Sequence, residues 1–144
     1  LFSATMAPEI EALARKYLRQ PIVVQVGRRS GAANTVQHVV YPVPHARKSA
    51  LLVKLLRDHG DGTSLVFTRT KHGADRVVRT LLDAGIEATA MHADKSQAQR
   101  IEALEGFRSG AVRVLVATDI AQRGLDISGI THVFNYDVPQ QAED

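Results

Sequence analysis

The sequence predicts an α/β fold in which helices cover both faces of a parallel β-sheet. Short, uninterrupted apolar runs such as Val114 to Ala117 are typical of strands that are buried on both faces. These runs alternate with segments of helical periodicity, which is the pattern of β-α-β units. The 144 residues, of which 44% are hydrophobic and 23% charged, are enough to bury the core of one domain.

The first 35 residues are predicted to stand apart from that sheet. A helix begins near Pro8, which suits a first turn, and ends before Pro21. A strand at 22–26 follows, and residues 28–35 are small and polar without periodicity, which is typical of an interdomain linker. We therefore expect residues 1–27 to be the tail of a preceding domain, residues 28–35 a linker and residues 36–144 the main domain.

The main domain is predicted to alternate strands and helices. Two of its helices end at Gly60 and Gly85, and a third begins at Ser96, which has capping-box spacing to Gln99. The predicted strands are 36–43, 65–67, 86–92, 114–117 and 132–136, and the predicted helices are 48–59, 72–84 and 96–108. Because crossovers between parallel strands are right-handed, we expect all strand-to-helix loops at one edge of the sheet.

Composition excludes several classes of function. The chain has no cysteine, so disulfides and thiolate metal sites are excluded. His45, His92 and His132 lack partners at ligand spacing, so we expect packing or surface roles and no metal site. No apolar run approaches the roughly 20 residues of a membrane helix, and nothing indicates secretion, so we expect a cytoplasmic protein. The start has no initiator methionine, which predicts a piece of a longer protein, and the net charge of +3 permits an anionic partner.

Polar and basic side chains follow the predicted strands at the edge where the loops gather. They are Thr68, Arg69, Thr70, Lys71, Lys95, Ser96, Gln97, Arg100, Thr118 and Arg123. Hydroxyls, amides and helix starts interleaved with guanidinium groups are the chemistry of a phosphate-backbone contact, and these loops lack aromatics for base stacking. Arg69 and Lys71 are equally well explained as solvated residues, whereas Arg100 in a first helical turn opposes the helix dipole and favours an anionic partner.

Five stretches, in this order, resemble motifs of the DEAD-box RNA helicases of superfamily 2. The stretches are Ser3-Ala4-Thr5 for motif III, 65–71 for motif IV, 92–100 for the motif with the Gln-x-x-Arg element, 117–126 for motif V, and 133–139 for the segment after it. The resemblance covers the whole chain, and motif V followed by Asn-Tyr-Asp-x-Pro is its most specific part. It implies a RecA-like sheet, with residues 36–144 as the second RecA-like (helicase C-terminal) domain without its C-terminal end. The Lys-Ser-Gln wording also resembles the bacterial RhlE-type branch.

The resemblance implies a role for each matching residue. The residues that match RNA-backbone positions are Thr70, Asp94, Gln97, Arg100, Thr118 and Arg123. Gly124 and Asp126 match ATP-binding positions, where the Asp126 carboxylate meets the ribose hydroxyls. Ser3, Thr5 and Asp119 match residues that couple nucleotide state to domain closure, with Asp119 organising the motif VI arginines.

The chain departs from the family pattern in two places and lacks three motifs. Ala93 stands where glycine is usual, and we expect its Cβ either to crowd a close backbone approach to RNA or to remove a positive-φ option. Gln122 stands where alanine is common. The sequence has no P-loop and no Asp-Glu-Ala-Asp, and it ends before motif VI with its phosphate-contacting arginines. We therefore expect a longer parent that uses ATP and Mg²⁺ to close two RecA-like domains on RNA and separate short duplexes. This stretch alone is expected neither to hydrolyse ATP nor to bind it stably.

Two other functions stay open at this point. One is a non-catalytic RNA-binding or scaffold module of the same fold, which intact Walker and arginine motifs in the flanking sequence would exclude. The other is a superfamily 2 helicase for DNA, which a preference for ribose over deoxyribose oligomers would exclude. The expected partners are RNA and the missing first RecA-like domain, with no membrane, and we expect a monomer.

Overall fold

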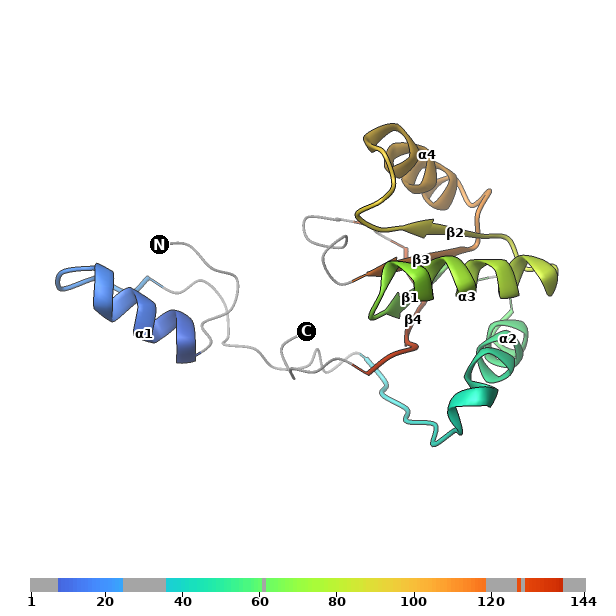
Figure 1. Cartoon of the computed structure of the whole chain (residues 1–144), viewed down its shortest axis with the longest axis horizontal. Helices are drawn as coiled ribbons and strands as arrows, with labels where there is room; N and C mark the ends of the chain where they lie inside the picture. Colours follow the sequence, from blue (N-terminus) through green and yellow to red (C-terminus); the bar gives the residue numbers. More distant parts are fainter. Residues whose placement is uncertain (1–7, 25–35, 61, 119–126, 128, 139–144) are drawn as a thin grey trace. The chain divides into compact units, whose positions relative to one another are not determined.

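The computed structural model describes residues 8–24, 36–60, 62–118, 127 and 129–138. The chain divides between Tyr41 and Pro42 into two units, each described by itself. In the first unit, α1 spans Pro8–Tyr17 and confirms the helix predicted after Pro8 (Figure 1). The predicted linker at 28–35 lies outside the described residues, so that boundary stays a prediction.

The strands predicted in the first 43 residues do not form where the structure describes the chain. Residues 22–24 and 36–44 carry no secondary structure, and the apolar Val24 and Val40 are 83% and 87% exposed. The backbone N–H and C=O groups of a strand need a neighbouring strand, and no described strand pairs with either segment. The prediction at 36–43 is therefore wrong, and that at 22–26 is wrong for 22–24; residues 25 and 26 lie outside the described part.

The second unit alternates strands and helices as predicted. A short 3-10 helix, η1 (His45–Arg47), precedes the regular elements. The helices are α2 (Lys48–Asp58), α3 (Lys71–Asp83) and α4 (Gln97–Arg108), and the strands are β1 (Ser64–Thr68), β2 (Ala88–Met91), β3 (Val114–Thr118) and β4 (His132–Asn135). Each of these α-helices and strands overlaps the range predicted for it from the sequence, which confirms the α/β class, whereas η1 was not predicted.

The four strands form one parallel sheet in the order β2-β3-β1-β4. The two central strands are in register from Ser64 opposite Val114 to Thr68 opposite Thr118. Since all strands are parallel, their carboxyl ends lie at the same edge, as the sequence predicted. This edge is the place where ligands bind in open α/β sheets.

Helices cover both faces of the sheet. Successive residues of the central strands point to opposite faces, and both sets of side chains are apolar, so each face packs against helices. On one face, Val66 of β1 and Val116 of β3 pack against α2 and α3. On the other face, Leu65 and Leu115 pack against Phe107 of α4 (Figure 1). The predicted RecA-like layering, with helices on both faces, is confirmed.

Local signals set the helix ends. Gly60 and Gly85 follow α2 and α3 with φ of +69° and +74°, a left-handed conformation that glycine adopts without strain. Ser96 caps α4, and its predicted capping box with Gln99 is present. No helix in the described ranges is long and apolar enough to cross a membrane.

Candidate nucleic-acid interface

The middle of the carboxyl edge is formed by two buried threonines. Thr68 ends β1 and Thr118 ends β3, and the two are paired across the sheet. They are only 1% and 9% exposed, so the packing around them restricts the positions of both side chains. Thr118, a predicted RNA contact, therefore lies at the edge as expected, beside the loop that follows β1.

That loop leads directly into the start of α3. Thr70 is the N-cap, and its side-chain oxygen accepts a hydrogen bond from the backbone N–H of Gly73 at 3.0 Å. The hydroxyl of Thr68 donates to the Thr70 carbonyl at 3.3 Å, which holds the turn against the sheet. The Thr70 hydroxyl proton is left to donate elsewhere, and Thr70 is exposed at the predicted interface.

The loop from β2 to α4, together with the first turn of α4, carries three further predicted RNA contacts. Asp94 and Gln97 are exposed, and Arg100 is half-buried in the first turn of α4. The Ser96 N–H donates to the Gln99 side chain at 2.9 Å, and the Gln99 N–H donates back to the Ser96 hydroxyl at 3.3 Å. This capping box is the sequence signal that placed Gln97 and Arg100 at a helix start.

The described α-helices of the second unit, α2, α3 and α4, begin without an acidic residue in the first turn. The N-terminus of a helix carries a partial positive charge, which acidic residues there would normally neutralise. Here the first turns carry Lys48, Lys71 and Arg100 instead. Because α3 and α4 follow strand ends at the carboxyl edge, their positive ends add to its potential for binding anions.

Three lysines near this edge are each paired with an aspartate. Lys71 contacts Asp94 at 2.8 Å, Lys95 contacts Asp75 at 3.1 Å and Lys48 contacts Asp137 at 2.7 Å. The Lys71 ammonium holds the pKa of the Asp94 carboxyl below its usual range. These lysines are therefore already neutralised in part.

The arginines at the edge differ from the lysines. Among the described residues, neither Arg69 nor Arg100 takes part in an ion pair. Arg69 is exposed directly after β1, and its backbone N–H donates to Asp137 at 3.0 Å, so its side chain is not needed for that contact. Within the described part of this edge, these two guanidinium groups therefore remain available to pair with an external anion.

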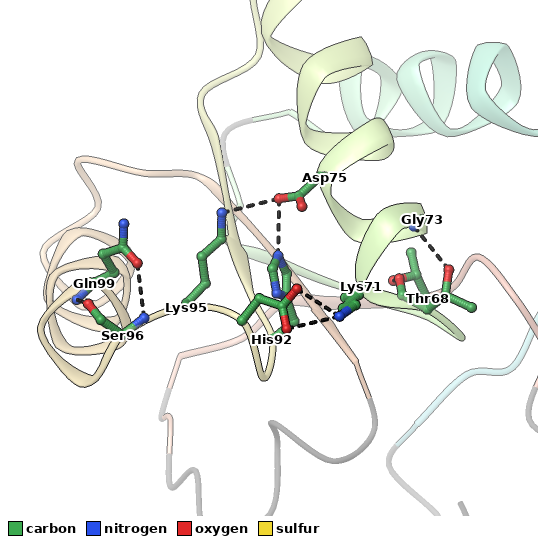
Figure 2. A network of polar contacts seen from close by, with 10 residues as sticks. Thr68, Lys71, Gly73, Asp75, His92, Lys95, Ser96 and Gln99 are labelled. Atoms are coloured by element: carbon green, nitrogen blue, oxygen red, sulfur yellow. Dashed lines mark hydrogen bonds and ion pairs between the residues drawn. The ribbon is translucent and has the colours of Figure 1, made fainter.

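Several residues at this edge were not found by reading the sequence. Asp75 on α3 accepts hydrogen bonds from His92 at 3.0 Å and from Lys95 at 3.1 Å, as Figure 2 shows. The hydrogen bond from His92, followed by that from Lys95, holds the pKa of Asp75 below its usual range although burial opposes this. His92 is 2% exposed, which confirms the predicted packing role. No sequence signal pointed to Asp75, because its partners come from another loop.

The segment after β4 docks against the start of α2. Burial raises the pKa of Asp137, but hydrogen bonds from Lys48 and from the backbone N–H of Arg69 outweigh it and hold that pKa below its usual range. Tyr136 shares a hydrogen bond of 2.9 Å with Ser49, and the Lys48 ammonium lies 4.5 Å from the centre of its ring. The resemblance to the Asn-Tyr-Asp-x-Pro segment placed these residues at the edge but did not predict their partners.

The remaining predicted site residues cannot be placed. They are Ser3, Thr5, Asp119, Arg123, Gly124 and Asp126, and all lie outside the described residues, as does Gln122. The ATP-binding and coupling assignments therefore stay predictions. Where the structure describes the chain, no three acidic or histidine side chains come together as metal ligands.

Comparison with known proteins identifies the family. Residues 47–144 match the helicase conserved C-terminal domain. The chain is 44% identical over 143 residues to DEAD-box ATP-dependent RNA helicase 21 of Oryza sativa subsp. japonica, and 40% identical over 144 residues to ATP-dependent RNA helicase vasa of Drosophila melanogaster. These matches cover 99% and 100% of this chain but only 19% and 22% of the relatives, so the chain spans about a fifth of their length.

Solved structures agree with this match. A structure titled "S. cerevisiae Dbp5 bound to RNA and ADP BeF3" is 27% identical, with a TM-score of 0.84 over 99% of this chain and 37% of that one. The E. coli DEAD-box protein SrmB is 39% identical, with a TM-score of 0.64 over 67% of this chain and 57% of that one. The chain belongs to the helicase conserved C-terminal domain family, with DEAD-box RNA helicases among its relatives.

Proposed function

We propose that this chain is the RNA-gripping half of an ATP-dependent DEAD-box RNA helicase. Residues 36–144 would be the second RecA-like domain, residues 28–35 the linker and residues 1–27 the end of the first. The parent would close both domains on single-stranded RNA when ATP and Mg²⁺ bind, and would separate short duplexes locally. Relatives named as ATP-dependent RNA helicases support this proposal.

The observation that carries the proposal is the charge arrangement at the carboxyl edge. Two arginines without ion pairs in the described part of the chain lie beside helix starts that no acidic residue neutralises. Guanidinium groups and helix N-termini bind phosphate without reading bases. The RNA in the solved Dbp5 complex supports the same type of ligand for this chain.

The other edge residues fit a ribose-phosphate chain. Thr70 has a hydroxyl proton to donate, which suits a phosphate oxygen. The Asp94 carboxylate repels phosphate but accepts a hydrogen bond from a ribose 2′-hydroxyl, which deoxyribose lacks. A surface of this kind would prefer RNA to DNA while tolerating any base sequence.

The first test is an amide NMR titration of this chain with a short single-stranded RNA and with DNA of the same sequence. The expected result is that shifts gather at Thr70, Gln97, Arg100 and Thr118 and are larger with RNA. Equal shifts with both oligomers would favour a DNA helicase instead. Shifts scattered over the outer faces of the helices would contradict the proposed interface.

The second test is Arg100→Ala. Loss of one phosphate contact should weaken binding by about 1 kcal/mol for all sequences alike and reduce the salt slope by about 0.7, the value for one phosphate on a single strand. Fluorescence anisotropy at several salt concentrations measures both quantities. A loss restricted to some RNA sequences would contradict backbone gripping.

A non-catalytic scaffold of the same fold predicts the same RNA binding by this chain. The longer parent distinguishes the two functions. A helicase hydrolyses ATP faster when RNA is present, and Asp126→Ala should then weaken nucleotide binding with little effect on nucleotide-free RNA binding. A scaffold would show RNA binding without RNA-stimulated hydrolysis.

A further inference from the structure

The loop between β2 and α4, residues 92–96, carries the proposed RNA contact Asp94 and leads into two more, Gln97 and Arg100, in the first turn of α4. We propose that Asp75 of α3 is a positioning residue that fixes this loop in the geometry that grips RNA. The inference rests on the proposed function, because the loop matters only if it contacts RNA. Asp75 itself need not touch the RNA. It concerns how Asp94, Gln97 and Arg100 are held in place.

Asp75 holds the loop at two points. One carboxylate oxygen, Oδ1, lies 3.0 Å from Nε2 of His92 and 3.1 Å from Nζ of Lys95. Figure 2 shows the side chains of His92 and Lys95 pointing to Asp75 from the loop. In the sequence these two residues flank Asp94. The backbone N–H of Lys95 also donates to the His92 carbonyl at 3.1 Å, which closes a turn around Asp94.

Burial makes the contact with His92 hard to replace. The His92 side chain is 3% exposed, and its Nδ1 atom is buried without a hydrogen-bond partner among the described residues. Nε2 therefore depends on Asp75. If the Asp75 carboxylate were removed, both ring nitrogens would be buried and unpaired, which is unfavourable. The loop could relieve this only by moving His92 toward water, and that would displace Asp94 with it.

The second tether of the loop is weaker. Lys71 contacts the Asp94 carboxylate at 2.8 Å, but the two side chains are 43% and 55% exposed, and exposed ion pairs contribute little to stability. Asp75 lies on the same helix as Lys71 and is itself 46% exposed, but its partner His92 is 3% exposed, so this contact is anchored in the core at its loop end. A contact anchored on a rigid helix can place a loop accurately.

The test compares Asp75→Ala with the matched control Asp58→Ala. Asp58 is also a helical aspartate paired with a lysine, Lys54, but it ends α2, at the other end of that helix from Lys48 and the interface. Asp75→Ala is expected to shift or broaden the amide signals of residues 93–97 in the free chain. At equal folded fraction, it should weaken binding of a fluorescein-labelled oligouridine about fivefold, the size of one hydrogen bond. The control should change neither.

Asp75→Asn keeps an oxygen that can accept a hydrogen bond from His92, so its RNA affinity should lie between those of Asp75→Ala and the unchanged chain. If Asp75→Ala does not fold, the same amide shifts and RNA affinity are measured on Asp75→Asn. The inference is overturned if the amides of 93–97 do not move, or if RNA affinity stays within twofold while Arg100→Ala still weakens binding. If Arg100→Ala also leaves binding unchanged, the proposed function fails first. A pure stability effect would change the folded fraction and not the affinity of the folded chain.

Discussion

The centre of the sheet and its carboxyl edge are built from the same strands but differ in what their residues do. Val66, Leu115 and Val116 in the middle of β1 and β3 are completely buried. Directly after β1 ends, Arg69 and Thr70 are exposed. The centre therefore supplies stability, and the edge leaves positive charge and hydroxyl groups available. Substitutions should separate these two roles.

The largest expected effect lies in the core. Phe107 lies on the side of α4 that faces the sheet and is 2% exposed. Phe107→Ala should lower the free energy of unfolding by about 3–5 kcal/mol, because it removes buried apolar surface and leaves a cavity. Urea denaturation measures this change. Ile101 on the same helix is 47% exposed, so Ile101→Ala is the matched control and should cost less than about 1 kcal/mol. Similar losses from both would contradict the assignment of the α4 core face.

A smaller effect is expected where the edge meets the fold, at Asp137. Asp137→Ala should lower stability by about 1.5 kcal/mol, because it removes a charged acceptor from Lys48 and from the backbone of Arg69. The folded-state pKa of Asp137 is below the ordinary value of 3.8, so its contribution is complete above that value and is lost as the pH falls through the folded pKa. Denaturation between pH 6 and pH 3 measures this. If the variant loses stability over this range as steeply as the parent chain does, Asp137 is not responsible.

The smallest effect on stability is expected at the exposed edge. Arg69→Ala should leave unfolding within about 0.5 kcal/mol, since the Asp137 contact uses the backbone of Arg69. It should weaken RNA binding about threefold and reduce the salt slope by about 0.7. Arg79 is an equally exposed arginine in the later part of α3, and Arg79→Ala is the control for net charge. Equal losses from both arginines would show a diffuse charge effect and not a defined interface.

Much of the fold could be predicted from the sequence, because its signals are local. Helical periodicity, the glycines after α2 and α3 and the Ser96 capping box all act within a few residues. The alternation of strand and helix then placed Thr68 and Thr118 at one edge. Helical periodicity alone does not fix which apolar residues are covered: Leu82 of α3 and Ile101 of α4 are 48% and 47% exposed, since the pattern does not show how far a neighbouring element extends over a helix.

What could not be predicted depends on partners that are distant in the chain. The apolar residues at 36–43 predicted a strand, but a strand also needs a paired neighbour, which the described sheet does not provide there. The pairing of Lys48 with Asp137 joins residues from opposite ends of the second unit. The contact of His92 with Asp75 is equally invisible in a linear pattern. Six predicted site residues, including Arg123 and Asp126, stay untested because they lie outside the described residues.

The strand order β2-β3-β1-β4 also has a consequence for how the chain folds. Among the described strands, only β2 and β3 are neighbours both in the sequence and in the sheet. The two strands that pair with β1, namely β3 and β4, are synthesised after α3, β2 and α4. Folding is slow when the chain must lose the entropy of closing long loops before the stabilising contacts between distant strands can form. During synthesis, the apolar strand β1 therefore waits unpaired until Val114–Thr118 emerges. We expect a slow folder, prone to aggregate in that interval, for which helix formation precedes assembly of the sheet.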